Sequence, residues 1–470
     1  MTNPSSPPPS EEQTRPEETT ETAYVVDDDY VRRISELLEA GRTGEVERII
    51  ALLHSADLAD LLERLHPEDR ATVVGIIRPL LRLDGEVLTY LNEDVRAEIF
   101  KQLTPQEIAA ALAGLDSDDA LTLIEDLEED EREEILAALP VRRRLLVEEG
   151  LTFPEYSAGR LMQREYIAVP MFWTVGKTID YLRAADDLPD DFFLIFTVDP
   201  RHRPVGSVPL SRILRSRRSV KIADLVQDEI RPIHATTDQE EVAYMFRQYG
   251  LVSAPVVDDA GRLIGVITID DVVDVIDEEA EDDLFKLGGI SEDDLYRAVL
   301  DTSRSRLPWL AINMVTAIVA ASVVALFEST IASVVALAVL MPIVAGMGGN
   351  AGTQALTVAV RAIAMRELSS SNAWRVLSKE LLVGIVNGSL LAAAAALIAG
   401  LWFGDPTIGL VIGAAMIINI GLASFFGALV PLGLRKIGVD PAVASAVFLT
   451  TLTDTIGFFA LLGLATWILL

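Results

Sequence analysis

The sequence predicts a multidomain membrane protein with an all-α superhelical N-terminal domain, a duplicated α/β region, a connecting helix and a five-helix transmembrane bundle. Three observations predict this fold class. Leucines recur every 12 residues in an acidic helical region, a strand–turn–strand–helix pattern occurs twice, and five apolar segments of membrane-spanning length fill the C-terminal third. The predicted parts are a disordered tract (1–23), the helical domain (24–157), two α/β copies (158–222 and 223–276), the connecting helix (277–305) and the transmembrane domain (306–470).

Charge is distributed unevenly along the chain. The 470 residues carry a formal net charge of −32, yet Arg306 and the residues after it include seven Lys and Arg against six Asp and Glu. The soluble part is therefore strongly acidic, which disfavours nucleic acid and anionic lipid headgroups as partners and favours cations. The absence of cysteine excludes disulfides and thiolate metal ligands. The first 23 residues are rich in Pro, Ser, Glu and Thr, a composition typical of disorder.

The helical domain is organised by a leucine repeat. Most of its leucines are followed by a short polar sequence such as Thr104-Pro105-Gln106-Glu107, which is typical of a helix N-cap with a carboxylate in the first turn. This alternation predicts short helices stacked in a superhelix. The repeated leucines are Leu91, Leu103, Leu115, Leu127 and Leu139.

The duplicated region contains two copies of one pattern. Strand-like segments occupy 196–200 and 204–208 in the first copy, and 254–259 and 261–268 in the second. The pattern resembles a tandem pair of CBS domains. Because such pairs often bind adenosine nucleotides, the resemblance implies an ATP site, with Thr268 and Asp271 at the ribose- and phosphate-contacting positions.

The first copy departs from that nucleotide-binding pattern. It has Ser207 and Ser211 but no aspartate after them, which weakens its nucleotide site. The alternative is a purely structural CBS pair that transmits another signal.

A highly charged helix is predicted after the second copy. Almost no Lys or Arg is interleaved before Lys286, so intrahelical pairing cannot relieve the repulsion and the helix needs cations. Its carboxylates are Asp270, Asp271, Asp274, Asp277, Glu278, Glu279, Glu281, Asp282 and Asp283.

Five apolar segments predict a multi-pass membrane protein. Glu328 and Asp405 mark loops without basic residues, whereas Arg and Lys collect at the other ends of the segments. The positive-inside rule then predicts a cytoplasmic N-terminus and an outside C-terminus, in a bacterial inner membrane. The predicted spans are 308–327, 331–360, 381–403, 408–434 and 442–470.

Asp454 is the one carboxylate within the last predicted span. An ionised carboxylate there costs several kcal/mol unless it faces a partner or a wet cavity. The alternative is an aspartic acid kept neutral or bonded to a neighbouring helix. Helical spacing predicts two polar faces, one with Thr450, Asp454 and Gly457 and the other with Gly346, Asn350 and Gln354.

The other polar groups in the spans are neutral oxygen and nitrogen groups. One carboxylate surrounded by amides and carbonyls suits Mg²⁺, which prefers oxygen ligands and keeps several waters. All four histidines lie outside the spans, which disfavours a transition-metal site and, with no HExxH motif, a zinc protease. Gly348 and Gly352 also have the spacing that lets helices pack closely.

Four motifs together resemble the MgtE family of magnesium channels. They are residues 277–289, 306–310, 342–354 and 450–458. The resemblance implies a homodimer with the pore at its two-fold axis, in which Asp454 binds hydrated Mg²⁺ and Asn350 and the Gly346 region line the path.

The same resemblance implies a regulatory Mg²⁺ sensor. The family often has a carboxylate at the position of Gly250, so one sensor site of this chain is weaker or rebuilt. The positions that match the family's acidic residues are Asp238, Glu240, Asp271, Asp274, Glu279, Asp282 and Asp283.

We therefore expect a Mg²⁺-gated magnesium channel and not an enzyme, with Mg²⁺, the lipid bilayer and a second copy as partners and no nucleic acid. A CBS-regulated channel or exchanger for Mn²⁺, Co²⁺ or Ca²⁺ is the alternative, because these ions also accept oxygen ligands. A membrane-anchored nucleotide sensor needs only a single span, so five spans with an internal Asp454 disfavour it.

Overall fold

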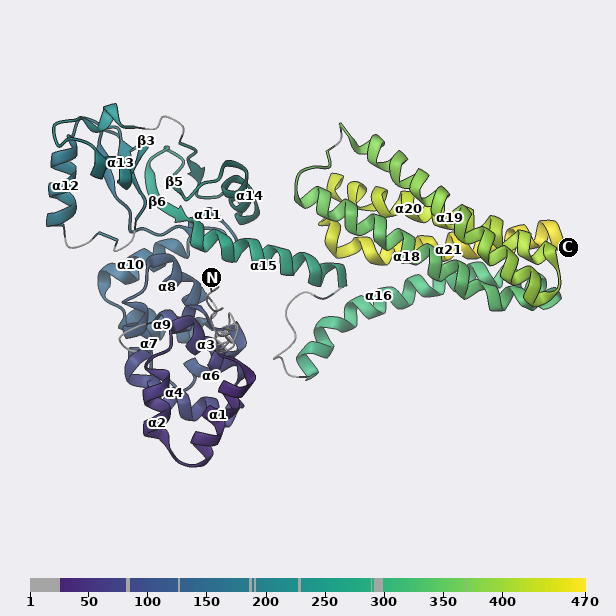
Figure 1. Cartoon of the computed structure of the whole chain (residues 1–470), viewed down its shortest axis with the longest axis horizontal. Coiled ribbons are helices and arrows are strands. Elements are labelled where there is room, and N and C mark those ends of the chain that lie inside the picture. The colour runs from purple at the N-terminus through teal and green to yellow at the C-terminus, as the bar shows by residue number, and fades with distance from the viewer. Residues whose placement is uncertain are drawn as a thin grey trace, which may run out of the picture. The chain divides into compact units, whose positions relative to one another are not determined.

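The computed structural model describes residues 26–81, 85–125, 127–185, 188–189, 192–226, 230–288, 290, 299–369 and 371–470. The tract predicted at 1–23 lies outside these ranges. The described chain forms two compact units, Met1–Thr236 with Pro255–Val266, and Thr237–Ala254 with Ile267–Leu470. Figure 1 shows the elements of both units.

Short helices build the N-terminal part of the first unit, as the leucine repeat predicts. All five repeated leucines are buried in one continuous core, and the Thr104 and Glu107 side chains form the predicted capping box. The helices are α1 (Asp28–Glu39), α2 (Thr43–Ile50), α3 (Ser55–Arg64), α4 (Pro67–Leu81), α5 (Glu86–Thr89), α6 (Glu93–Phe100), α7 (Pro105–Leu112), α8 (Ser117–Glu125), α9 (Glu129–Ala138) and α10 (Val141–Gly150).

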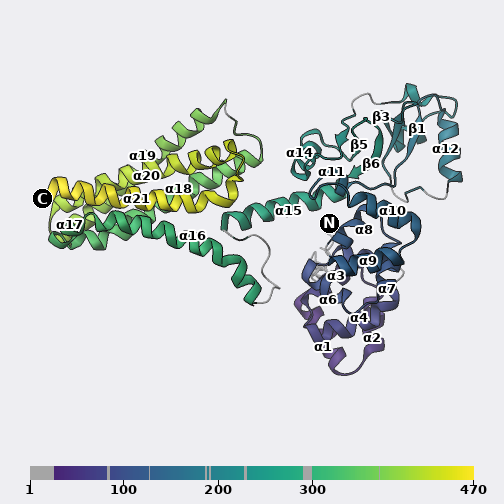
Figure 2. The same ribbon diagram turned by 180° about the vertical axis from the view of Figure 1, so that it is seen from behind.

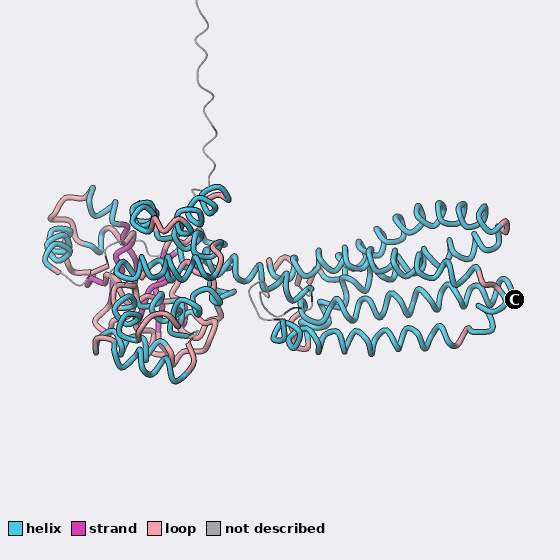
Figure 3. Tube along the Cα trace, turned by 90° about the horizontal axis from the view of Figure 1, so that it is seen from below, coloured by secondary structure: helices cyan, strands magenta, loops and turns pink. Residues whose placement is uncertain are grey.

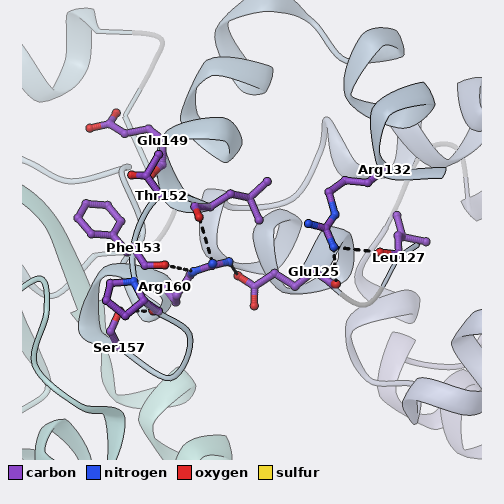
Figure 4. A network of polar contacts seen from close by, with 10 residues as sticks. Glu125, Leu127, Arg132, Glu149, Thr152, Phe153, Ser157 and Arg160 are labelled. Atoms are coloured by element: carbon purple, nitrogen blue, oxygen red, sulfur yellow. Dashed lines mark hydrogen bonds and ion pairs between the residues drawn. The ribbon is translucent and has the colours of Figure 1, made fainter. Parts of the chain in front are cut away.

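Arginine side chains close the ends of these helices. Arg160 donates to the backbone carbonyls of Phe153 and Leu151 and pairs with the Glu125 carboxylate, while Arg132 donates to the carbonyls of Glu125 and Leu127 (Figure 4). Carbonyls at a helix C-terminus have no partner within their own helix. The guanidinium groups therefore satisfy them and hold the last helices together.

Two three-stranded sheets follow, in the orders β1-β2-β3 and β4-β5-β6. In the first sheet β1 is parallel to β2 and β2 is antiparallel to β3, and in the second β4 is parallel to β5. Figure 2 shows the strands grouped together with α12 at one edge. The elements are α11 (Ala158–Leu161), β1 (Ala168–Pro170), α12 (Val175–Ala184), β2 (Leu194–Val198), β3 (Pro204–Pro209), α13 (Leu210–Arg215), a 3₁₀ turn (Ile222–Asp224), β4 (Ile233–His234), α14 (Gln239–Tyr249), β5 (Ser253–Val257) and β6 (Leu263–Thr268).

The acidic helix predicted from 270 onward is one continuous element, α15 (Ile269–Gly288). It starts directly after β6 and continues without a break through 276 and 277, where the sequence suggested a domain boundary. One continuous helix therefore joins the second α/β copy to the residues that precede the membrane helices.

The C-terminal part contains five helices that are long and apolar enough to cross a membrane, as predicted. They run side by side in Figure 3, and α20 packs against α18, α19 and α21. The helices are longer than the predicted spans at several ends, so Arg361 and Glu380 lie inside α18 and α19. Their bounds are α16 (Val299–Ala325), α18 (Ala336–Ala364), α19 (Ala373–Phe403), α20 (Pro406–Lys436) and α21 (Pro441–Leu469), with a short α17 (Glu328–Ser333).

Candidate ion pathway and cation-sensing region

Asp454 lies in the middle of α21 and is half-buried. The threonines before it are bonded to their own helix: Thr450 Oγ1 donates to the carbonyl of Ala446 at 2.9 Å, and Thr453 Oγ1 to that of Thr450 at 3.0 Å. Among the described residues no hydrogen bond or ion pair engages the Asp454 carboxylate. A membrane helix thus presents one carboxylate without a protein partner, the arrangement expected where a cation or water is the partner.

The three residues of the predicted polar face of α18 lie on one exposed face of the single chain. Gly346, Asn350 and Gln354 are all exposed, and so are Thr353 and Thr357. Amide and hydroxyl groups within a membrane-spanning helix are costly to expose to lipid. This face therefore needs a wet cavity or a protein partner.

The opposite face of α18 packs against its neighbours. Gly348 lies against the Asn419 side chain and Gly352 against Leu449 of α21, so a Cβ on either glycine would meet these atoms at 2.2 and 3.1 Å. The close-packing interpretation of the Gly348/Gly352 spacing is therefore confirmed. A difference from the sequence prediction is Gly457, which packs against Asn419 and is buried instead of sharing an open face with Asp454.

Carboxylates from α14 and α15 meet in the second unit. Asp238 caps α14, and the Gln239 amide donates to Glu279 of α15 at 2.7 Å. Burial raises the pKa of the Glu240 carboxyl, and the charges of Glu279, Asp238 and Asp283 raise it further. The structure therefore brings together acidic residues that the family resemblance identified only as separate positions in the sequence.

The remaining predicted sensor residues lie along α15. Burial raises the pKa of Asp283, and the nearby Asp440 carboxylate adds to the effect. Burial likewise raises the pKa of Asp274, helped by Asp277 and Asp270 near the start of the helix. Within the described ranges no three His, Asp or Glu side chains are arranged so that they could hold a metal ion, so the sensor sites stay predictions.

The two residues predicted to contact a nucleotide are adjacent. Thr268, the last residue of β6, donates its hydroxyl to the Asp271 carboxylate of α15 at 2.7 Å. The hydrogen bond fixes both side chains at the junction of strand and helix.

Two basic residues that the sequence did not single out connect α14 and α15 to the membrane helices. Lys286 Nζ contacts Asp282 at 2.5 Å and Asp440, the N-cap of α21, at 2.9 Å. Arg366, just after α18, contacts Glu241 at 3.5 Å and lies 4.4 Å from the centre of the Tyr244 ring.

Two carboxylates favour the charged form of the Lys286 ammonium group. Partial burial by itself would lower that pKa, but the hydrogen bonds and charges of Asp282 and Asp440 outweigh burial and raise it. The only sequence signal for this contact is a lone lysine at the end of an acidic helix.

An open cleft of about 530 Å³ lies where these elements meet. Its charged lining includes Glu240, Glu279, Asp283, Lys286, Arg366 and Asp440. The cleft places carboxylates of the acidic helix beside the beginning of α21, the helix that carries Asp454.

The fold and the site together define a multi-pass membrane protein in which the acidic helix α15 joins an α/β region to a bundle with an internal carboxylate. Three family models match the chain: a divalent cation transporter model, MgtE, at residues 341–464, the MgtE intracellular N domain at 53–156 and a CBS domain at 222–278.

Relatives agree with these matches. The chain is 32% identical over 444 residues to the magnesium transporter MgtE of Thermus thermophilus, covering 93% of this chain and 98% of the relative, and 34% identical over 308 residues to that of Enterococcus faecalis, covering 66% and 68%. A solved structure, the cytosolic domain of the Mg²⁺ channel MgtE in complex with ATP, is similar at 30% identity and a TM-score of 0.48, covering 52% of this chain and 99% of that one. The chain belongs to the MgtE family of magnesium transporters, which confirms the resemblance predicted from its motifs.

Proposed function

We propose that this chain is a Mg²⁺-gated magnesium channel of a bacterial inner membrane, with its N-terminus in the cytoplasm and its C-terminus outside. The observation that carries the proposal is the continuous connection from the acidic helix α15, through Lys286 and Asp440, to the helix that holds Asp454. Its test is Mg²⁺ uptake into proteoliposomes, where flux must fall as Mg²⁺ rises on the side of the soluble domains.

In the proposed pore, Asp454 holds a hydrated Mg²⁺ while Asn350 and the backbone near Gly346 contact its water shell. Mg²⁺ sheds its waters reluctantly, so a carboxylate that binds through water combines attraction with fast release. Two observations support this assignment: the Asp454 carboxylate has no hydrogen-bond or ion-pair partner among the residues that the structure describes, and α18 has an exposed polar face.

The proposed gate depends on charge repulsion. When Mg²⁺ is scarce, Glu240, Glu279 and Asp283 repel one another, and α15 separates from α14 and from α21. When Mg²⁺ is abundant, it bridges these carboxylates and α15 packs against the start of α21. The pKa values of Glu240 and Asp283, which burial and neighbouring carboxylates raise, support the presence of this repulsion.

The working unit is proposed to be a homodimer, with the pore between two copies. Support comes from the polar face of α18, because a second copy would cover groups that otherwise face lipid. Five spans per copy also provide few helices to enclose a complete pathway.

Cysteine cross-linking tests the dimer. The chain has no cysteine, so Gln354→Cys creates a single reactive site on the exposed face of α18. Treatment with a short bifunctional maleimide in membranes is expected to give a covalent dimer on a denaturing gel. Leu390→Cys on α19 is the matched control, since Leu390 is also exposed in the single chain but lies outside the proposed interface. Equal cross-linking at both positions, or none at Gln354, would contradict the proposed interface.

The proposal includes an ATP site at the CBS pair, formed by Thr268 and Asp271. The hydrogen bond between their side chains supports it, because it fixes a hydroxyl and a carboxylate side by side for a ribose. In equilibrium dialysis the detergent-solubilised protein is expected to bind ATP, and Asp271→Asn is expected to bind it about tenfold more weakly, the loss of one charge-assisted hydrogen bond. Binding that is absent from the wild type, or unchanged in the variant, would refute this site.

A further inference from the structure

Asn419 is a fully buried amide inside the membrane bundle, and the proposed function so far gives it no role. It lies on α20 with no exposed surface, and its Nδ2 donates to the backbone carbonyl of Val344 on α18 at 2.9 Å. Its Oδ1 is buried and has no hydrogen-bond partner in the described part of the chain. Burying an amide oxygen unpaired lowers stability, so an apolar residue would serve better if only packing were needed.

Two glycines from two different helices make room for this side chain. A Cβ at Gly348 of α18 would lie 2.2 Å from Asn419 Nδ2, and a Cβ at Gly457 of α21 would lie 2.7 Å from the same atom. Both distances are far below van der Waals contact. The Asn419 amide is therefore inserted between α18 and α21: it donates to the α18 backbone and occupies the space that a side chain at Gly457 of α21 would need.

The contact positions relate directly to the candidate pathway. Val344 and Gly348 flank Gly346 on α18, and they lie on the face opposite Gly346 and Asn350, because two residues turn a helix by about 200°. Gly457 follows Asp454 by three residues, somewhat less than one turn of α21. One side chain thus sets the distance and register between the helix with the polar face and the helix with the carboxylate.

We propose that Asn419 is a positioning residue for ion selection: its amide fixes α18 against α21 so that the Gly346–Asn350 face and Asp454 are held at the separation suited to hydrated Mg²⁺. This inference rests on the proposed channel function. It predicts that changing the Asn419 amide alters the preference among cations, whereas a residue that only fills space would affect folding alone.

Three variants separate the two roles. Asn419→Leu keeps the size but removes the donor, and Asn419→Asp keeps the shape but replaces the donor with an acceptor facing the Val344 carbonyl. The double variant Asn419→Ala with Gly457→Ala returns a methyl group to the space that the amide leaves, so it remains informative if the single variants fail to fold.

The measurement is uptake of Mg²⁺, with Ca²⁺ and Co²⁺ as competing ions, into proteoliposomes that contain equal amounts of folded protein. We expect the ratio of Mg²⁺ to Ca²⁺ uptake to fall about tenfold, a change of about 1.4 kcal/mol, in the variants that fold, including the double variant. An unchanged ratio in all folded variants would overturn the proposal.

The wild type provides the reference that keeps two failures apart. If the wild type takes up Mg²⁺ through Asp454 and the folded Asn419 variants keep the selectivity of the wild type, the positioning role is wrong and the channel function stands. If the wild type takes up no Mg²⁺, the proposed function itself fails.

Discussion

Asp454→Asn is expected to lower Mg²⁺ uptake into proteoliposomes at least about a hundredfold. The substitution keeps the shape of the side chain and removes the only charge available to a cation in the middle of α21. At a separation of about 4 Å and an effective dielectric constant of about 20, each unit charge pair contributes about 4 kcal/mol, and Mg²⁺ carries two charges. A hundredfold change needs about 2.7 kcal/mol, which is about a third of that total.

The matched control for this variant is Glu328→Gln. Glu328 is an exposed carboxylate in the membrane domain, at the start of α17, and its loss is expected to leave uptake within about twofold of the wild type, as for other exposed substitutions. Thermal unfolding of both variants checks that they fold. Normal uptake by folded Asp454→Asn would mean that the pathway lies elsewhere and that this carboxylate is structural.

Breaking the contact between Lys286 and Asp440 is expected to weaken gating. The contact ties the end of α15 to the N-cap of α21, so Lys286→Met should favour the separated, open arrangement. A partly exposed ion pair of this kind contributes about 1 kcal/mol, so about fivefold more Mg²⁺ should be needed on the soluble side to halve the flux. The maximal flux in low Mg²⁺ should be unchanged.

Asp440 is also the N-cap of α21, so the substitution that tests its ion pair must preserve the cap. Its carboxylate also accepts a hydrogen bond from the backbone of Ala442 at 2.8 Å, so Asp440→Asn keeps the helix cap and removes the charge. Asp405→Asn is the control, because Asp405 caps α20 in the same way, by accepting a hydrogen bond from the backbone of Thr407 at 2.8 Å. Among the described residues Asp405 forms no ion pair with α15. Equal shifts in the Asp405 and Asp440 variants would show that capping, and not the ion pair, governs the gate.

Local sequence patterns were sufficient to predict most of the fold. The 12-residue leucine repeat predicted the stacked helices because a leucine at each helix end must be buried for short helices to pack. The apolar lengths predicted the five spans, and the acidic run predicted α15. Each of these signals comes from the spacing or composition of residues that are near one another in the sequence, which is where periodicity is informative.

Local sequence patterns could not predict the contacts on which the proposed mechanism depends. Lys286 and Asp440 are far apart in sequence, and nothing in the sequence around either residue indicates the other as its partner. Asn419 was one neutral polar residue among many, and only the structure reveals that Gly348 and Gly457 leave space for it. Tertiary pairing of this kind depends on how helices pack, which no single segment encodes.

The most direct measurement of the central claim is Mg²⁺ uptake into proteoliposomes as Mg²⁺ is titrated on the side of the soluble domains, with Asp454→Asn in parallel. The account predicts uptake that requires Asp454 and falls off as that Mg²⁺ rises into the millimolar range, where each weak site contributes only about 4 kcal/mol. Uptake that stays constant across the titration would contradict the proposed gate, and uptake that persists in Asp454→Asn would contradict the proposed pore.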